Sequence, residues 1–435
     1  MQLLLAAGGG LLFLGLLMAA STTISASMQT PGASMWAQLI HELIFIGLSA
    51  PVFWLAVRVP PNVYRRLAYP LLGLSLMLLV GVLVPGVGAT INGAHRWIGL
   101  GSLSLQPSEF AKLAMLLWSA DLLARKEKLG TLTTLRHVLV PLVPAFVAVI
   151  GLVMLEPDLG TTLCFVLILL GLLWSVGLPG RYFTGMLAAV VAAVTLLAVI
   201  SPYRLQRLTT FLHPYADQQG SGYQTVQAFH ALHHGGLFGV GLGASTYKYG
   251  WVPNANSDYV FAIVGEELGL LGCLVVLMLF ALFAYAAMRI ALRSRDPFIR
   301  LTAAGSGIWL GGQALINTGY VSGLLPVTGI PLPFISNGGT SLILTCGVLG
   351  MLVCFARHEP AAWAAAQAAA AAGTTPAWVR LLGLRPATVA AVRAAPPSQP
   401  VAVPHIAPAR PEPGRTPAAA PGLTLGGDED IRAAG

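Results

Sequence analysis

Long apolar runs recur along this chain from Leu3 to Ala356, and they limit its fold more than any other feature. Inside a lipid bilayer every backbone N–H and C=O group needs a partner within the protein, so only helices and closed barrels cross it. The runs have the length of helical spans, which need about 20 mainly apolar residues. Only 9% of the 435 residues are charged, far fewer than in a soluble domain. The sequence therefore predicts an all-α polytopic membrane protein.

About ten transmembrane helices are expected. The first run ends in Ser25-Ala26-Ser27, which resembles a signal-peptide cleavage site, but no basic residue precedes the run. We therefore expect a retained first span. The predicted spans are residues 3–27, 36–57, 68–89, 107–124, 137–155, 159–177, 182–200, 259–288, 300–320 and 340–356.

The placement of Lys and Arg predicts the orientation, because cytoplasmic loops carry the excess of basic residues. Thirteen of the 18 basic residues up to Arg357 fall on one side of the predicted spans and four on the other. Both termini are then cytoplasmic (N-in/C-in), and a large extracytoplasmic loop, residues 201–258, precedes the eighth span. This orientation explains the net charge of +8, and no Lys/Arg-rich block indicates nucleic-acid binding.

The composition changes after Arg357. Residues 358–435 are rich in Ala and Pro, which is typical of a segment that cannot bury an apolar core. We therefore predict two parts, a transmembrane domain at 1–357 and a disordered cytoplasmic tail at 358–435. The four cysteines all lie within apolar runs, and we expect them to be buried free thiols.

Acidic residues at membrane depth are the main functional candidates, because a carboxylate is costly in hydrocarbon unless it faces a cavity, a partner or a substrate. Asp258 stands where the large outer loop re-enters the membrane, and Glu266-Glu267 follow two turns later. In the fourth span, Glu109 and Lys112 are three residues apart and share a helix face. These two either neutralise each other or line a polar cavity.

Other outward-facing residues have two interpretations each. Asp158 is an acid site or simply a helix N-cap. Arg96 and Arg204 either reach lipid headgroups or bind an anionic substrate group through the guanidinium fork. In the loop Pro326–Ser341, Ser336 and the glycines Gly338-Gly339 either bind polar ligand groups or satisfy the loop itself.

Two further patterns lie in the large outer loop. His230, His233 and His234 could meet on one helix face, but no acidic or cysteine ligand is close in sequence to complete a metal site. The glycine-rich stretch Gly239–Gly243 follows no strand, so close backbone packing explains it better than nucleotide binding.

Several longer motifs occur in a fixed order. They are GAHRWIGLG at 93–101, LQPSEFAKLA at 105–114, EPDLGT at 156–161, GYQTVQA at 222–228, GGLFGVGLGAS at 235–245, SDYVFAIVGEELGLLG at 257–272 and LPVTGIPLPFISNGGTS at 325–341. In these motifs the chain resembles the SEDS family (shape, elongation, division, sporulation) of bacterial cell-wall glycosyltransferases, over about residues 1–357. Within the family it is more similar to the division members than to the elongation members.

The resemblance implies an enzyme that polymerises lipid II into glycan strands at the outer face of the cytoplasmic membrane, during division and at the septum. It implies Asp258 as the essential acid and general base, with a lipid pyrophosphate as the leaving group. It implies a class B penicillin-binding protein as transpeptidase partner, beside other division membrane proteins. The substrate-binding positions that we carry over or add are Arg96, Glu109, Lys112, Asp158, Arg204, Ser336, Gly338 and Gly339.

Three points stay open at this stage. A charged cavity at Glu109 and Lys112 would also suit a lipid II flippase, although no inverted repeat is found. The protein could instead be an elongation-type polymerase or a scaffold that recruits other division proteins. No cofactor is demanded, but a divalent cation, Mg or Mn, could assist the leaving pyrophosphate.

Overall fold

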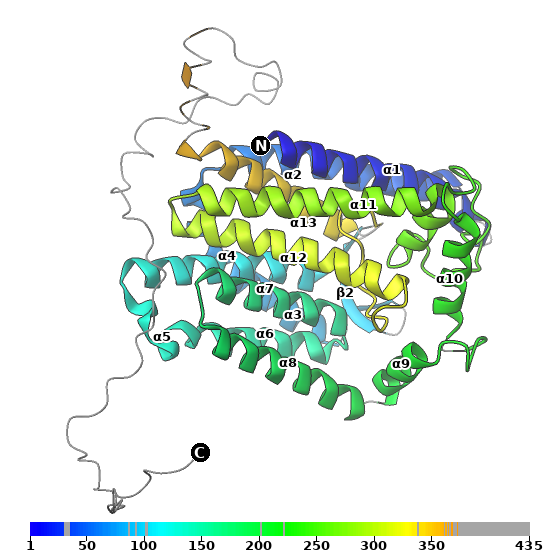
Figure 1. The fold of residues 1–435 in the computed structure, drawn as a ribbon, viewed down its shortest axis with the longest axis horizontal. Helices are drawn as coiled ribbons and strands as arrows, with labels where there is room; N and C mark the ends of the chain where they lie inside the picture. The colour runs from blue at the N-terminus through cyan, green and yellow to red at the C-terminus, as the bar shows by residue number, and fades with distance from the viewer. Residues whose placement is uncertain are drawn as a thin grey trace, which may run out of the picture.

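A bundle of long helices forms the protein, with a small sheet and the shorter helices Pro202–Leu212 and Tyr223–Gly235 at one end of the bundle (Figure 1). The computed structural model describes residues 1–29, 35–85, 88–91, 94–100, 103–200, 202–220, 222–336 and 339–360, with isolated positions between 362 and 372. The rest of the predicted tail lies outside the described residues.

Most of the helices overlap the predicted spans, but the predicted third span, 68–89, extends past the end of its helix at Leu83 and into a strand that begins at Gly88. The helices are α1 (Gln2–Gln29), α2 (Met35–Arg58), α3 (Pro61–Leu83), α4 (Pro107–Lys128), α5 (Leu135–Leu139), α6 (Leu142–Leu155), α7 (Leu159–Ser175), α8 (Gly180–Ile200), α9 (Pro202–Leu212), α10 (Tyr223–Gly235), α11 (Val260–Arg293), α12 (Pro297–Val321) and α13 (Gly339–Arg357), with a 3₁₀ turn η1 at Thr131–Thr133. Within the described part of the chain, five helical stretches are long and apolar enough to cross a membrane: Gln2–Thr22, Pro61–Leu83, Leu135–Leu155, Val260–Arg293 and Gly339–Arg357. The protein is thus a helical, multi-pass membrane protein, while the count of ten spans and the N-in/C-in orientation stay predictions.

Local sequence explains several helix starts. Pro61, Pro107 and Pro297 each occupy the first turn of a helix, where the missing N–H costs nothing and the fixed φ suits the helix. Asp296 caps α12 by accepting a hydrogen bond from the backbone N–H of Phe298 at 2.9 Å. The third helix begins before its predicted start at residue 68, because Pro61 already permits the first turn.

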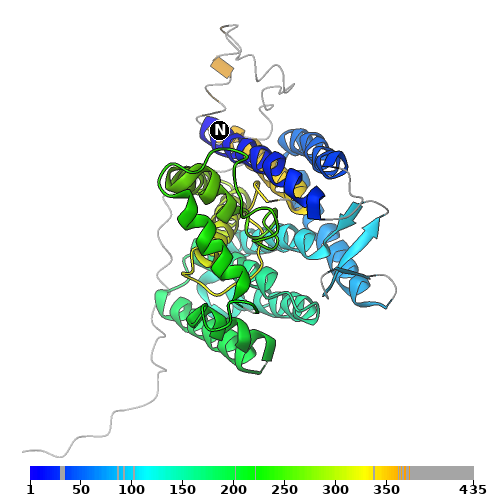
Figure 2. The ribbon, with the colours of Figure 1, turned by 90° about the vertical axis from the view of Figure 1, so that its right-hand side faces the viewer.

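A small sheet departs from the all-α prediction. Strands β1 (Gly88–Ile91), β2 (Ala94–Leu100) and β3 (Leu103–Leu105) form an antiparallel sheet in the order β1-β2-β3, with Ile98 opposite Leu105. The dipeptide Asn92-Gly93 between β1 and β2 strongly favours a hairpin turn, but a prediction from apolar runs does not take turn residues into account. Figure 2 shows the end of the bundle that carries this sheet. Helices α9 and α10 lie at the same end, across the bundle from the sheet.

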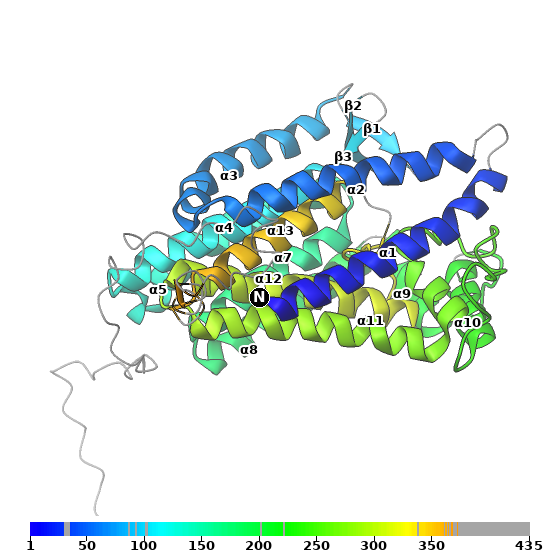
Figure 3. The same cartoon turned by 90° about the horizontal axis from the view of Figure 1, so that it is seen from above.

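Long helices pack in a definite order around the core. Helix α11 contacts α1, α10 and α12, and α12 also contacts α4 and α7. Helix α2 packs on α13, and α3 lies along α4 at the margin of the bundle (Figure 3). Helix α12 therefore lies at the centre of the bundle, where α4 and α7 contact it as well as α11.

Candidate functional site

Helix α11, which follows Asp258, is broken at Gly269. At the break, the glycine-rich loop packs on the backbone of Glu266 and Glu267. Gly269 has φ 67° and ψ −167°, so the helix hydrogen bonds are interrupted there. The glycine-rich loop replaces them: the N–H groups of Val240 and Gly241 donate to the carbonyl oxygens of Glu266 and Glu267 at 2.9 and 3.1 Å. A Cβ at Gly269 would lie 2.4 Å from the backbone nitrogen of Gly239, so a glycine is required. The expectation of close backbone packing is confirmed for Gly239, where a Cβ would lie 2.2 Å from the carbonyl oxygen of Glu267, but not for Gly241 and Gly243, where a Cβ would meet no atom closer than 4.0 Å.

Glu266 is fully buried and saturated with hydrogen-bond donors. Its Oε1 accepts from the N–H of Thr246 at 2.9 Å and lies 3.0 Å from Nδ1 of His234. Its Oε2 accepts from the hydroxyl of Ser245. Of the three histidines considered for a metal site, His234 therefore binds a carboxylate of α11 instead.

Glu267 forms a buried ion pair with Lys248. The Nζ atom of Lys248 donates to Oε1 of Glu267 at 2.9 Å, to Oγ of Ser21 at 2.8 Å and to the carbonyl of Gly243 at 2.8 Å. Both charged side chains are about 1% exposed or less. This cluster joins α1, the large outer loop and α11, so it fixes the loop on the bundle.

Asp258 has a different environment, in the turn just before α11. Its side chain is half-buried and accepts one hydrogen bond, from the hydroxyl of Ser257 to Oδ1 at 3.0 Å. Burial raises the pKa of this carboxyl above its usual value, while Ser257 and the nearby Arg207 oppose that shift. The carboxylate keeps most of its acceptor capacity for another molecule.

The backbone of Asp258 is fixed by a polar face of α12. The amide of Asn317 donates to the carbonyl oxygens of Asp258 and Ile330 at 2.8 and 2.7 Å. The hydroxyl of Tyr320 lies 2.8 Å from the same two carbonyls. One helix therefore holds together the start of α11 and the loop before α13.

That loop is held by a second set of contacts. Gln313 donates to the carbonyl of Pro331 at 2.9 Å. The hydroxyl of Ser336 donates to the carbonyl of Ser257 at 2.6 Å and accepts from the N–H of Leu332 at 2.7 Å. Ser336 therefore helps to fix the Asp258 turn by its hydrogen bond to Ser257, the residue before Asp258.

Glu109 and Lys112 form the ion pair that their spacing predicts. Nζ of Lys112 donates to Oε1 of Glu109 at 2.8 Å, and both side chains are buried in the first turns of α4. The ammonium also lies 5.3 Å from the ring centroid of Trp309 on α12. The indole N–H of Trp309 donates to Gln313 at 2.9 Å, which links this pair to the polar face of α12.

Arg96 and Asp158 come together beside that pair. Asp158 caps α7 by accepting from the N–H of Thr161 at 3.0 Å, and its Oδ2 lies 3.9 Å from Nη1 of Arg96. Arg96, on β2, also donates to the carbonyls of Glu156 and Pro157 at 3.0 and 2.6 Å. The interpretation of Asp158 as a helix cap is therefore confirmed, and its place beside Arg96 makes it part of a charged cluster as well.

Glu156 is a buried acid that sequence reasoning passed over. Neither carboxylate oxygen has a hydrogen-bond partner among the described residues, and the side chain is 1% exposed. Burial, with a contribution from Asp158, raises the pKa of Glu156 to about 8. The residue is therefore mainly neutral at pH 7.

Three predicted positions have other outcomes. Gly338 lies outside the described residues, and so does the side chain of Arg204, whose backbone is in α9. Gly339 begins α13, and a Cβ there would lie 2.3 Å from the ring of Phe45. The described residues thus support Gly339 as a close packing position of α2 on α13.

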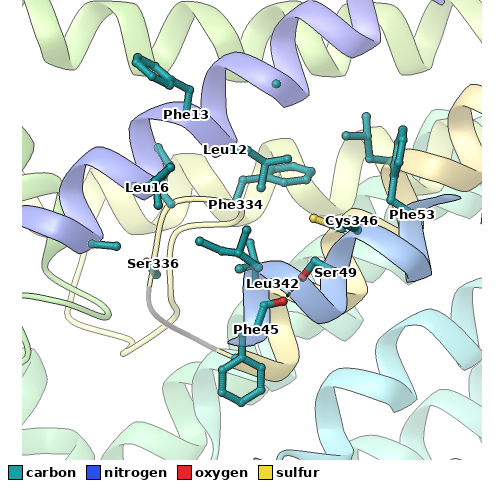
Figure 4. Close-up of a pocket in the computed structure, with 18 of the residues that line it drawn as sticks. Leu12, Phe13, Leu16, Phe45, Ser49, Phe53, Phe334, Ser336, Leu342 and Cys346 are labelled. Atoms are coloured by element: carbon teal, nitrogen blue, oxygen red, sulfur yellow. Dashed lines mark hydrogen bonds between the residues drawn. The ribbon is translucent and has the colours of Figure 1, made fainter. Parts of the chain in front are cut away.

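A large apolar cavity adjoins the Asp258 turn. It has a volume of about 630 Å³ and lies between α1, α2 and α13 (Figure 4). Leu12, Leu16 and Phe53 contribute to its apolar lining, while Ser336 and Asn256 bring it to the turn that carries Asp258. The polar site and an apolar cavity therefore share one loop.

The polar face of α12 was not predicted as part of the site. Trp309, Gln313, Asn317 and Tyr320 follow at intervals of four, four and three residues, so they share one face of the helix. Gln313 and Asn317, two amides four residues apart in an apolar helix, could have predicted this face from the sequence, because buried amides need hydrogen-bond partners.

No group of three or more His, Cys, Asp or Glu side chains within the described ranges is arranged to hold a metal ion.

Comparison with known proteins places these features in a family. The family profile described as "Cell cycle protein", that of FtsW, RodA and SpoVE, matches residues 1–361. A Mycobacterium tuberculosis protein named "Probable peptidoglycan glycosyltransferase FtsW" is 44% identical over 369 residues, which cover 84% of this chain and 70% of that protein. The Bacillus subtilis stage V sporulation protein E is 37% identical over 319 residues, covering 73% of this chain and 87% of that protein.

Solved structures agree with the sequence comparison. A chain from the structure titled "Structural coordination of polymerization and crosslinking by a peptidoglycan synthase complex" matches with a TM-score of 0.66 and 31% identity, over 81% of this chain and 98% of that one. The rod shape determining protein RodA of Thermus thermophilus matches with a TM-score of 0.59 and 28% identity, over 82% of this chain and 96% of that one. The chain therefore belongs to the cell cycle protein family of FtsW, RodA and SpoVE, the SEDS family that its ordered motifs indicate.

Proposed function

We propose that this protein is a peptidoglycan glycosyltransferase that polymerises lipid II at the outer face of the cytoplasmic membrane, with Asp258 as general base. The observation that carries the proposal is the Asp258 turn. Its carboxylate accepts a single side-chain hydrogen bond, and its backbone is fixed by Asn317 and Tyr320. The relatives named as peptidoglycan glycosyltransferases support the reaction class.

The chemistry requires a proton acceptor at a fixed place. A hydroxyl of the acceptor sugar attacks the anomeric carbon of the lipid-linked donor and loses its proton to Asp258. The bond from that carbon to the pyrophosphate breaks, and the lipid pyrophosphate leaves with the bonding electrons. A positioned general base contributes roughly 10²–10⁴-fold to such a step. The raised pKa of Asp258 makes its carboxylate a stronger base than an exposed one.

Cationic side chains would bind the pyrophosphate. Arg96 and Arg204 are the outward-facing candidates, because a guanidinium presents a fork that matches phosphate oxygens. Lys112 is already neutralised by Glu109 at 2.8 Å, so its role is more restricted. A divalent cation, Mg or Mn, could assist by binding the pyrophosphate together with a single carboxylate.

The apolar cavity would hold part of a prenyl chain. Its lining is mainly aliphatic and aromatic, and its volume of about 630 Å³ is in the range of ligand pockets. Because Asn256 and Ser336 lie on its wall, a chain seated there would place its headgroup near Asp258. This arrangement favours surface chemistry on a lipid-linked sugar.

The proposed partners and location rest on the relatives. We propose that the protein works with a class B penicillin-binding protein and other division membrane proteins, at the septum. The similar chain from a peptidoglycan synthase complex supports a transpeptidase partner, and the FtsW relatives support division over elongation. The N-in/C-in orientation, with Asp258 outside, is part of the same proposal.

Polymerisation of purified lipid II by the protein with its transpeptidase partner tests the proposal. Wild type should give long glycan chains, and Asp258→Ala should give none while keeping its melting temperature. Asp217→Ala is the matched control, since Asp217 is an exposed acid of the same outer loop and should be dispensable. Equal product from Asp258→Ala would remove Asp258 as the base. No product from a well-folded wild-type complex, together with lipid II transfer across vesicles, would favour the flippase.

A further inference from the structure

A second cavity, lined by polar and charged residues, lies far from Asp258, at the Arg-rich end of the bundle. It has a volume of about 360 Å³ and is formed where α3 begins and α4 ends. Its lining residues are Asn62, Arg65, Arg66, Asp121, Arg125 and Lys128. The positive-inside rule assigns this end to the cytoplasm, because most of the chain's basic loop residues are on this side.

Positive charge exceeds negative charge in this cavity, which we call the basic pocket. Its one carboxylate, Asp121, is buried and pairs with Arg65 at 3.2 Å and Arg125 at 2.7 Å. Arg66 and Lys128 are exposed and form no salt bridge with any described residue. Arg65 and Arg125 are thus held in place, while Arg66 and Lys128 stay available to an anion.

The backbone adds to this preference. Pro60 offers no side-chain cap to α3, so the first N–H groups of this 23-residue helix are not capped by a side chain. A helix N-terminus carries the positive end of the macrodipole and favours an anion. The N-terminus and the four basic side chains act on the same pocket.

An apolar, exposed helix face adjoins the basic pocket. Leu67, Leu74 and Met77 on α3 are 41–64% exposed and lie on one face of the helix. Arg66, which lines the pocket, precedes Met77 by eleven residues, close to three full helical turns, so this face of α3 begins at the pocket. An anion bound here would therefore have hydrocarbon-facing surface directly beside it.

We propose that the basic pocket binds the phosphodiester headgroup of an anionic phospholipid from the cytoplasmic leaflet, with the acyl chains along α3. Basic pockets between membrane helices at the cytoplasmic side have the charge that such headgroups need. Arg66 and Lys128 contact the phosphate, while Arg65 and Arg125, ordered by Asp121, shape the cavity. The site is independent of the Asp258 chemistry.

A lipid titration of the full-length protein in neutral detergent tests this site. Phosphatidylglycerol or phosphatidylcholine is added to the micelles, and bound lipid is counted by native mass spectrometry beside the melting temperature. The variant Arg66→Gln/Lys128→Gln removes two pocket charges and should fold normally, because neither side chain forms a salt bridge with a described residue. The control Arg136→Gln/Arg181→Gln removes two exposed charges from the same predicted side, outside the pocket.

Wild type and control should bind phosphatidylglycerol tightly and phosphatidylcholine weakly. The pocket variant should need about fivefold more phosphatidylglycerol for each removed charge, or roughly 25-fold in total. Equal binding by the pocket variant, or an equal loss in the control, would overturn the proposal. Saturation of the pocket by inorganic phosphate at the same concentration would also overturn it, because the ligand would then be a free anion.

Discussion

Asp258 and Glu267 lie within one short segment, yet the structure gives their carboxylates opposite surroundings. Glu267 is 1% exposed and ion-paired with Lys248, while Asp258 is half-buried and bonded only to Ser257 through its side chain. What is fixed at Asp258 is the backbone, by Asn317 and Tyr320. An acid that is buried and neutralised by a lysine of the same chain serves the fold, and one that is held only by its backbone can serve a substrate.

The largest expected effect separates the two acids by activity. Asp258→Asn removes the base while preserving shape and the hydrogen bond to Ser257, so the rate of lipid II polymerisation should fall roughly 10²–10⁴-fold. Its melting temperature should stay at the wild-type value. A rate assay and a melting curve on the same preparation check both statements.

The pH profile sharpens this expectation. Asp258 acts as a base only when deprotonated, so the wild-type rate should fall as the pH drops through a pKa above the ordinary value of 3.8. The assignment of Asp258 as the base would be contradicted by a wild-type rate that does not change over the acidic pH range. A lower melting temperature of Asp258→Asn would show instead that this residue, like Glu267, stabilises the fold.

The second effect is on stability. Glu267→Gln leaves the buried ammonium of Lys248 without its counter-charge, and breaking such a pair costs about 3–5 kcal/mol. We expect a clear loss in the free energy of unfolding, measured by denaturant in detergent. The double variant Lys248→Met/Glu267→Leu, which removes both charges, should recover most of it. If Glu267→Gln keeps its stability and loses polymerisation instead, Glu267 belongs to the active site.

Gly269→Ala should cost less, roughly 1–3 kcal/mol, because alanine is strained at φ 67° and its Cβ would meet Gly239. The melting temperature measures the effect. Gly151→Ala is the matched control, since no atom lies within 4 Å of a Cβ built there. Equal melting of both variants would show that the break in α11 is not set by this glycine.

The last effect concerns the pH dependence of stability and Glu156, an acid that is neither paired nor placed beside Asp258. Its folded pKa of about 8 lies above the ordinary 4.5, so the folded protein keeps a proton that the unfolded chain releases between these values. Stability should therefore decline as the pH rises from about 4.5 to about 8.

Glu156→Gln mimics the neutral form and should lack this decline. The difference in melting temperature between the variant and wild type, followed over that pH range, isolates the contribution of Glu156. A constant difference would mean that Glu156 is ionised at neutral pH and has a partner.

The helix positions could be predicted from the sequence, because an apolar run of membrane length must pair its backbone groups internally and a helix does so. The pair of Glu109 with Lys112 was predictable as well, since residues three apart on a helix are neighbours, and the structure joins them at 2.8 Å. The sheet at 88–105 was not predicted, since its signal is a local hairpin turn rather than a hydrophobic period.

Sequence alone determined that this chain is a helical membrane protein of one family, with a few acids at membrane depth. The tertiary structure decided which acid is available. The separation between Asp258 and Glu267 depends on Lys248, Ser21 and Asn317, which come from the outer loop, α1 and α12. Burial and hydrogen bonding depend on which distant segments meet, and neither the identity of an acid nor its neighbours in sequence contains that information.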